Sequence, residues 1–144
     1  MRRQDKYQDT NTFHYYNANP KNKITGDCVV RAISVALYQT YEETYQELFL
    51  YSLKTGYMLN DKKNYEKYLA SKGWLKKAQP KHPLTGNKYT GVEFCLHVQE
   101  CTFDFSSRML AHIGGHHIVA IVNGRVWDTW NSTGYCVGNY WVLP

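Results

Sequence analysis

Two apolar segments joined by Asn123-Gly124 constrain the fold of this chain more than any other feature. They span residues 117–122 and 125–128. An Asn-Gly pair between two such runs predicts a β-hairpin with a two-residue turn, and the turn fixes which residues face one another. The predicted pairs are Val122 with Arg125, Ile121 with Val126, and Ala120 with Trp127.

The predicted register places a histidine and a carboxylate on one face of the hairpin. Side chains alternate between the faces of a strand, so His117, Asp128 and Trp130 share a face. His117 and Asp128 are diagonal neighbours, with Cα atoms about 7–8 Å apart, which their side chains can span. A carboxylate bonded to an imidazole fixes its tautomer and stabilises the imidazolium. His116 is the alternative histidine, but it faces Asn131 in this register.

A second stretch, residues 25–33, places a cysteine between a turn and an apolar segment. Apolar residues recur at helical spacing from Asp27 to about Tyr38, which predicts a buried helix with Cys28 in its first turn. Unpaired N–H groups and the helix dipole at that end favour a thiolate, the nucleophilic form of cysteine. A packed core cysteine is the alternative, because free cysteines are among the most buried residues.

The remaining chain places helices first and strands afterwards, an order typical of an α+β fold. Capping-box patterns begin at Thr40 and Thr90, and Asn60 is the predicted cap of a helix between them. The first of these three helices is predicted to have an apolar face made of Tyr41, Tyr45, Leu48 and Phe49. We expect residues 1–144 to form a single domain, with residues 1–20 as an irregular N-terminal arm. The predicted helices span about 27–38, 40–54, 60–71 and 90–99, and the predicted strands include 74–75, 101–105, 109–113, 117–122, 125–128 and 136–142.

Composition narrows the classes of function. The formal charge is +5, but the lysines are spread through residues 54–88, which indicates a solvated basic surface rather than a nucleic-acid site. No apolar run is long enough to span a bilayer, and no apolar signal core follows the charged N-terminus. We therefore expect a cytoplasmic protein with reduced thiols. The four cysteines contain no C-x-x-C pair, so we expect no metal and no cofactor.

Cys28, His117 and Asp128 occur in the order found in papain-like cysteine peptidases, which this chain resembles. Gly26-Asp27-Cys28 is similar to the family's Gly-x-Cys, and Asp128-Thr129-Trp130 is similar to its Asn-Ser-Trp. The resemblance implies a papain-like α+β fold, in which an N-terminal helical half, with a buried helix starting at Cys28, packs on a C-terminal antiparallel sheet. It also implies a catalytic triad of Cys28, His117 and Asp128, shielded from water by Trp130.

The resemblance leaves the oxyanion donor open. The family uses a Gln six residues before the cysteine, and here that position is Asn22, one methylene shorter. The Asn22 amide can donate a hydrogen bond, with the Cys28 backbone N–H as the second donor. Asn19 and Thr25 are alternative donors.

The implied function is that of a cysteine (thiol) protease: a hydrolase or acyl transferase, a peptidase or isopeptidase, acting on a peptide or protein. The pattern that runs from Asn19-Pro20 to residues 138–141 also resembles small papain-like proteins of phages and Gram-positive bacteria. This second resemblance implies a phage protein that acts on a host protein in the host cytoplasm. A non-catalytic binding or inhibitor protein on the same scaffold is the alternative hypothesis, and nucleic-acid binding is a third.

Overall fold

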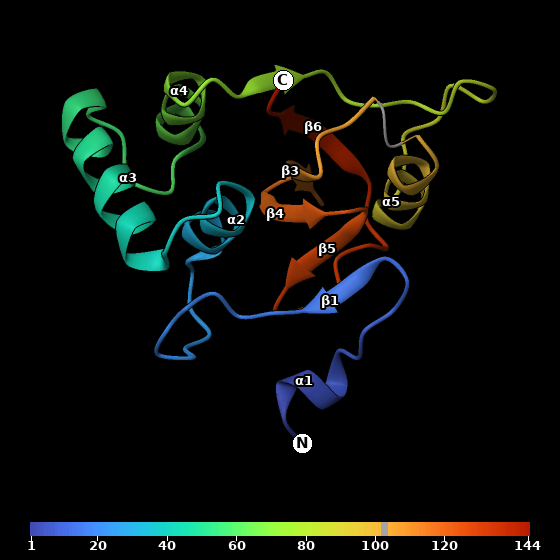
Figure 1. Cartoon of the computed structure of the whole chain (residues 1–144), viewed down its shortest axis with the longest axis horizontal. Coiled ribbons are helices and arrows are strands. Elements are labelled where there is room, and N and C mark those ends of the chain that lie inside the picture. Colours follow the sequence, from blue (N-terminus) through green and yellow to red (C-terminus); the bar gives the residue numbers. More distant parts are fainter. Residues whose placement is uncertain (102–103) are drawn as a thin grey trace.

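The computed structural model describes residues 1–101 and 104–144, in which five helices surround a six-stranded sheet (Figure 1). This arrangement confirms the predicted α+β class. No helix in the described ranges is both long enough and apolar enough to cross a membrane. The helices are α1 (Arg3–Lys6), α2 (Cys28–Ala36), α3 (Tyr41–Thr55), α4 (Lys62–Ser71) and α5 (Gly91–Glu100). The strands are β1 (Phe13–Tyr15), β2 (Leu75–Lys77), β3 (Arg108–Ile113), β4 (His117–Val122), β5 (Arg125–Asp128) and β6 (Val137–Val142).

The β4–β5 hairpin has the predicted register, with Ala120 opposite Trp127 and Ile121 opposite Val126. Its two turn residues both have positive φ, 49° at Asn123 and 77° at Gly124. A two-residue turn of this kind requires that conformation, which Asn and Gly adopt most readily. Glycine is also needed at position 124 for space, because a Cβ there would lie 3.0 Å from the Cys95 carbonyl oxygen.

The sheet, ordered β1-β5-β4-β3-β6-β2, separates two hydrophobic cores. On one face, α2, α3 and α4 cover inward side chains of β4 such as Ile118 and Ala120. On the other face, α5 covers Val119 and Ile121 (Figure 1). Successive side chains of β4 enter the two cores alternately, as the period-2 geometry of a strand requires. The helices therefore lie on both faces of the sheet rather than in one N-terminal half.

The sheet is mixed rather than antiparallel, because β1 pairs in parallel with β5. β1 lies within the segment that we expected to be an irregular arm. Phe13 anchors it, with no exposed surface, in the core beneath α5. The preceding segment is also fixed to the fold, since Arg3 Nε donates to the Thr129 carbonyl oxygen at 2.6 Å. A three-residue strand is too short for an alternation pattern to predict.

Most predicted element ends are confirmed. Thr40 caps α3, and Thr90 caps α5 with both hydrogen bonds of a capping box. The predicted cap Asn60 is wrong by one position, because the Asp61 side chain accepts the Lys63 N–H at the start of α4. Of the strand predicted at 101–105, residues 102–103 lie outside the described residues, and β3 begins only at Arg108.

Candidate active site

The fold places Cys28, His117 and Asp128 at one end of the sheet. Cys28 is the first residue of α2, His117 the first of β4, and Asp128 the last of β5. β4 and β5 are antiparallel, so His117 and Asp128 lie at the same end, opposite the turn. Figure 1 shows α2 beside that end, and α2 packs directly on β4. The structure thus brings together the three residues that the sequence singled out.

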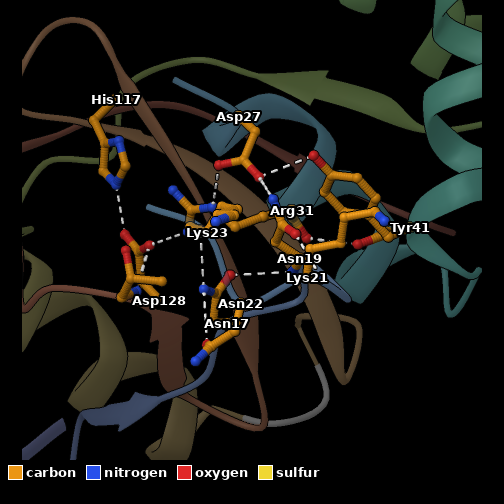
Figure 2. Close-up of polar contacts among 12 residues, drawn as sticks. Asn17, Asn19, Lys21, Asn22, Lys23, Asp27, Arg31, Tyr41, His117 and Asp128 are labelled. Carbon is orange, nitrogen blue, oxygen red and sulfur yellow. Dashed lines mark hydrogen bonds and ion pairs between the residues drawn. The ribbon is translucent and has the colours of Figure 1, made fainter. Parts of the chain in front are cut away.

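His117 lies between the carboxylate and the thiol. Its Nε2 is 2.5 Å from Asp128 Oδ2 (Figure 2), which leaves Nδ1 as the ring nitrogen available to Cys28. Burial alone would lower the pKa of the imidazole, but the bonds and charges of Asp128 and Cys28 outweigh it and raise the pKa to about 9. His117 is therefore positively charged at neutral pH.

The Cys28 thiol has the complementary shift. Burial favours the neutral thiol, but the hydrogen bond and the charge of His117 outweigh it, and the Ile118 backbone and the Arg31 charge add to the effect. The pKa of Cys28 is therefore lowered. The attraction that lowers the pKa of the thiol and raises the pKa of the imidazole favours a thiolate–imidazolium pair. This pair is the reactive form of a cysteine nucleophile.

Arg31 is the functional residue that we did not predict. It lies one turn after Cys28 on α2, and its Nη1 donates to Asp128 Oδ1 at 2.6 Å. The same guanidinium donates through Nε to Asp27 Oδ1 at 2.8 Å. Figure 2 shows these contacts as a chain from His117 through Asp128 and Arg31 to Asp27. The signal in the sequence was a single charged residue within the apolar segment 28–36.

Asp128 is almost completely buried, at 2 % exposure, but every side of its carboxylate is bonded. Besides His117 and Arg31, it accepts the Thr129 backbone N–H at 2.7 Å. Burial would raise its pKa, but His117 and Arg31 reverse the effect and lower it. A buried carboxylate that stays ionised is suited to orient an imidazolium.

Asp27 precedes α2 but does not cap it. Its carboxylate accepts hydrogen bonds from Arg31, from Tyr41 Oη at 2.9 Å and from Asn19 Nδ2 at 3.0 Å instead (Figure 2). The N–H groups of the first turn of α2 are therefore not capped by this side chain. The positive end of the α2 helix dipole lies directly at Cys28.

Trp130 packs on the imidazole as predicted. The Trp130 and His117 ring centroids are 4.9 Å apart. Tyr135 packs edge-on against the far side of Trp130, at 6.1 Å. Trp130 therefore packs against His117, and its role in shielding the His117–Asp128 hydrogen bond from water stays a prediction.

The three side chains considered as oxyanion donors have different surroundings. Asn22 is exposed, and its Oδ1 accepts a hydrogen bond from Asn17 Nδ2 at 3.3 Å. The Asn19 amide donates to Asp27. Thr25 is exposed in the turn before Cys28. The assignment of Asn22 remains a prediction.

Cys28 borders a cavity of about 230 Å³ that Lys62, His116 and His112 also line. His116, the alternative histidine, lies here rather than on Asp128. The His112 imidazole is hydrogen-bonded to the Tyr65 hydroxyl. Burial, assisted by the charge of Lys62, lowers the pKa of His112 to about 4, so this histidine is neutral at neutral pH.

All four thiols of the chain are free. In the described ranges, no group of three His, Cys, Asp or Glu residues is arranged to hold a metal ion. No protein-family model matches this chain, and the searches of curated proteins and of solved structures found no match either. The likeness to papain-like peptidases therefore rests on the motifs and on the geometry of the site.

Proposed function

We propose that this protein is a cysteine-nucleophile hydrolase or acyl transferase of papain-like type, acting as a peptidase or isopeptidase. The supporting observation is the geometry of the site: Cys28 begins α2, His117 begins the strand on which α2 packs, and His117 Nε2 is held by the buried Asp128 carboxylate. Each residue of the pair shifts the pKa of the other toward the charged form.

The reaction begins with attack of the Cys28 thiolate on a substrate carbonyl carbon. A carbon–sulfur bond forms, and the carbonyl π electrons move to oxygen. When the intermediate collapses, the carbon–nitrogen bond breaks and His117 Nδ1 gives its proton to the leaving amine. Water then attacks the thioester and passes a proton to His117, which releases a carboxylic acid and restores the thiolate.

The start of α2 provides stabilisation for the oxyanion. The Cys28 backbone N–H is in the uncapped first turn of the helix, and the helix dipole favours negative charge there. Asn22 is our proposed second donor, on the basis of its position six residues before the nucleophile. Removal of one such donor typically slows catalysis about 10²–10³-fold.

Arg31 acts as a positioning residue in this scheme. It holds Asp128 from the side opposite to His117, and it is attached to the helix that carries Cys28. Its charge also keeps Asp128 ionised. Arg31 therefore fixes the orientation of His117 through Asp128 without contact with the substrate.

Alkylation by iodoacetamide between about pH 5 and 9 tests the proposal, with modification at each cysteine followed by peptide mass mapping. We expect Cys28 to react well below about pH 8.5, the ordinary pKa of a thiol, and to react slowly in His117→Ala. Cys136 is exposed and serves as an internal reference thiol. Reaction of Cys28 with the same pH dependence as Cys136 would contradict an activated thiolate.

The acyl-transfer step requires its own experiment. The protein is incubated with peptide thioesters and activated peptide esters, and its intact mass is followed with time. An acyl adduct that appears on Cys28, decays with release of acid and is absent from Cys28→Ala supports turnover. A reactive thiolate that forms no acyl adduct with any of these esters would contradict a hydrolase.

A further inference from the structure

We propose that an apolar groove along α3 binds apolar side chains of the polypeptide substrate close to the bond that reacts. This inference rests on the proposed function, since it assigns a substrate class to the same site. The α3 groove has a volume of about 690 Å³. Its apolar lining comes from α3 and the segment that follows it: Tyr45, Phe49, Leu53, Tyr57, Met58 and Leu59.

The apolar lining of the groove is unusually exposed. Tyr45, Phe49 and Leu53 are spaced four residues apart and so lie on one side of α3. We expected Tyr45, Leu48 and Phe49 to face the core, and Leu48 is fully buried, but Tyr45 and Phe49 are 47 % and 48 % exposed. Single exposed apolar residues are common, whereas a contiguous set that lines a groove marks a binding surface.

The groove lies next to the candidate active site. Its wall includes residues 25–27, which directly precede Cys28 in the chain. Asn60 lines both the α3 groove and the smaller cavity that Cys28 borders, so the two cavities share a wall residue. An extended polypeptide advances about 3.3 Å per residue, so a segment that reacts at Cys28 can reach the groove with side chains a few residues away.

The charge of the groove selects the type of occupant. Although the chain has a formal charge of +5, no Lys, Arg or Glu lines the groove. Its one acidic residue, Asp27, has its carboxylate bonded to Arg31 and Tyr41. A neutral, apolar surface does not suit phosphates but does suit leucyl, phenylalanyl or methionyl side chains. Met58 is 74 % exposed and flexible, so it can adjust to different apolar shapes.

Peptidyl chloromethyl ketones of different sequence test the groove, because they alkylate the nucleophile after binding beside it. We compare a Leu-Phe probe with a Gly-Gly probe by the second-order rate of Cys28 labelling. Burial of a large apolar side chain changes an equilibrium by about tenfold or more, so we expect the Leu-Phe probe to react about tenfold faster. Iodoacetamide labelling of the same protein reports the thiolate without use of the groove.

Two variants of α3 form a matched pair. Leu53 lines the groove and is 68 % exposed, whereas Leu50 lies outside the groove wall and is 65 % exposed. We expect Leu53→Asp to abolish the preference for the Leu-Phe probe and Leu50→Asp to retain it. Thermal melts verify that both variants fold, and size-exclusion chromatography reports their oligomeric state.

The possible failures are distinguishable. Equal rates for both probes with rapid iodoacetamide labelling would overturn the groove and leave the nucleophile intact. Slow iodoacetamide labelling at neutral pH would overturn the proposed function itself. If Leu53→Asp dissociates an oligomer but keeps the probe preference, the groove is a contact between copies of the chain and not a substrate site.

Discussion

Two histidines close to Cys28 have opposite pKa shifts. His112 on β3 and His117 on β4 are offset by one position and lie on opposite faces of the sheet, since His112 pairs with Ile118 and His117 with Ile113. Burial favours the neutral form of both imidazoles. The hydrogen-bond partner decides the result: a carboxylate raises the pKa of His117 to about 9, whereas His112, bonded to a tyrosine, has its pKa lowered to about 4.

The thiols of Cys95 and Cys28 also have opposite pKa shifts. Burial raises the pKa of the Cys95 thiol to about 12, and a backbone hydrogen bond from Val126 does not compensate. Burial acts on Cys28 in the same direction, but the His117 imidazolium reverses it. Cys95 is fully buried, whereas Cys28 is partly exposed and has His117 beside it. The smaller burial and the charged neighbour of Cys28 together account for the difference between the two pKa values.

Substitution of each histidine in turn should give the largest difference in the rate of acylation. We expect His117→Ala to slow acylation of Cys28 by an activated peptide ester at pH 7 by about 10²–10⁴-fold, because the general acid–base group is lost. His112→Gln, which retains a polar partner for Tyr65, should react close to the wild-type rate. A similar loss in both variants would show that the wrong histidine has been assigned.

Removal of Arg31 should have the next largest effect. Arg31→Met removes the guanidinium that bonds two buried carboxylates, Asp27 and Asp128, and we expect a loss of about 3–5 kcal/mol in the free energy of unfolding. Urea denaturation measures this change. Arg2→Met breaks an exposed ion pair with Asp5 and should leave the midpoint unchanged. Equal midpoints for both variants would mean that the buried ion chain contributes no net stability.

The charge of His117 should be visible in the pH dependence of alkylation. Because its pKa is raised to about 9, the imidazolium persists through neutrality and is lost above that pH. Iodoacetate is an anion and iodoacetamide is neutral, so their rate ratio at Cys28 should fall about fivefold between pH 7 and 10. That factor corresponds to about 1 kcal/mol, the attraction of unit charges about 4 Å apart in water.

The exposed Cys136 is the control in the same protein, because its iodoacetate-to-iodoacetamide rate ratio should not change with pH. By linkage, the stability contributed by His117 is fully present below its unfolded pKa of about 6.5 and is lost as the pH rises through about 9. An iodoacetate-to-iodoacetamide ratio at Cys28 that does not change with pH would contradict the imidazolium.

The smallest predicted effect concerns His112. The positive charge of Lys62 is one of the groups that lower the pKa of this histidine. Lys62→Gln should therefore raise the pKa of His112 by a fraction of a unit, as followed by NMR titration, and leave His117 protonated at neutral pH. A pKa of His112 that does not move would show that the charge of Lys62 does not contribute to the shift.

The parts of the site that the sequence predicted depend on local patterns. The Asn123-Gly124 turn sets the β4–β5 register, and that register places His117 and Asp128 on one face. The turn before Cys28 similarly sets the start of α2. In both cases a few neighbouring residues determine the geometry, so the sequence alone is sufficient.

The parts that the sequence did not predict depend on contacts between distant segments. β1 is defined by its parallel pairing with β5, more than a hundred residues away in the chain. The buried side of α3 depends on how the helix packs against α2 and α4, which its own periodicity does not specify, and so Phe49 was placed inward. The Arg31–Asp128 ion pair joins residues that are 97 positions apart.

The long separation in sequence also sets when the pKa of the Cys28 thiol can be lowered during synthesis. Cys28 leaves the ribosome long before His117, Asp128 and the hairpin that holds them. Until β4 and β5 dock on α2, no imidazolium lies beside the thiol and Arg31 has no distant carboxylate to bind. A partly made chain therefore has a cysteine of ordinary pKa, and the shift arises only when the β4–β5 hairpin has been made and has docked.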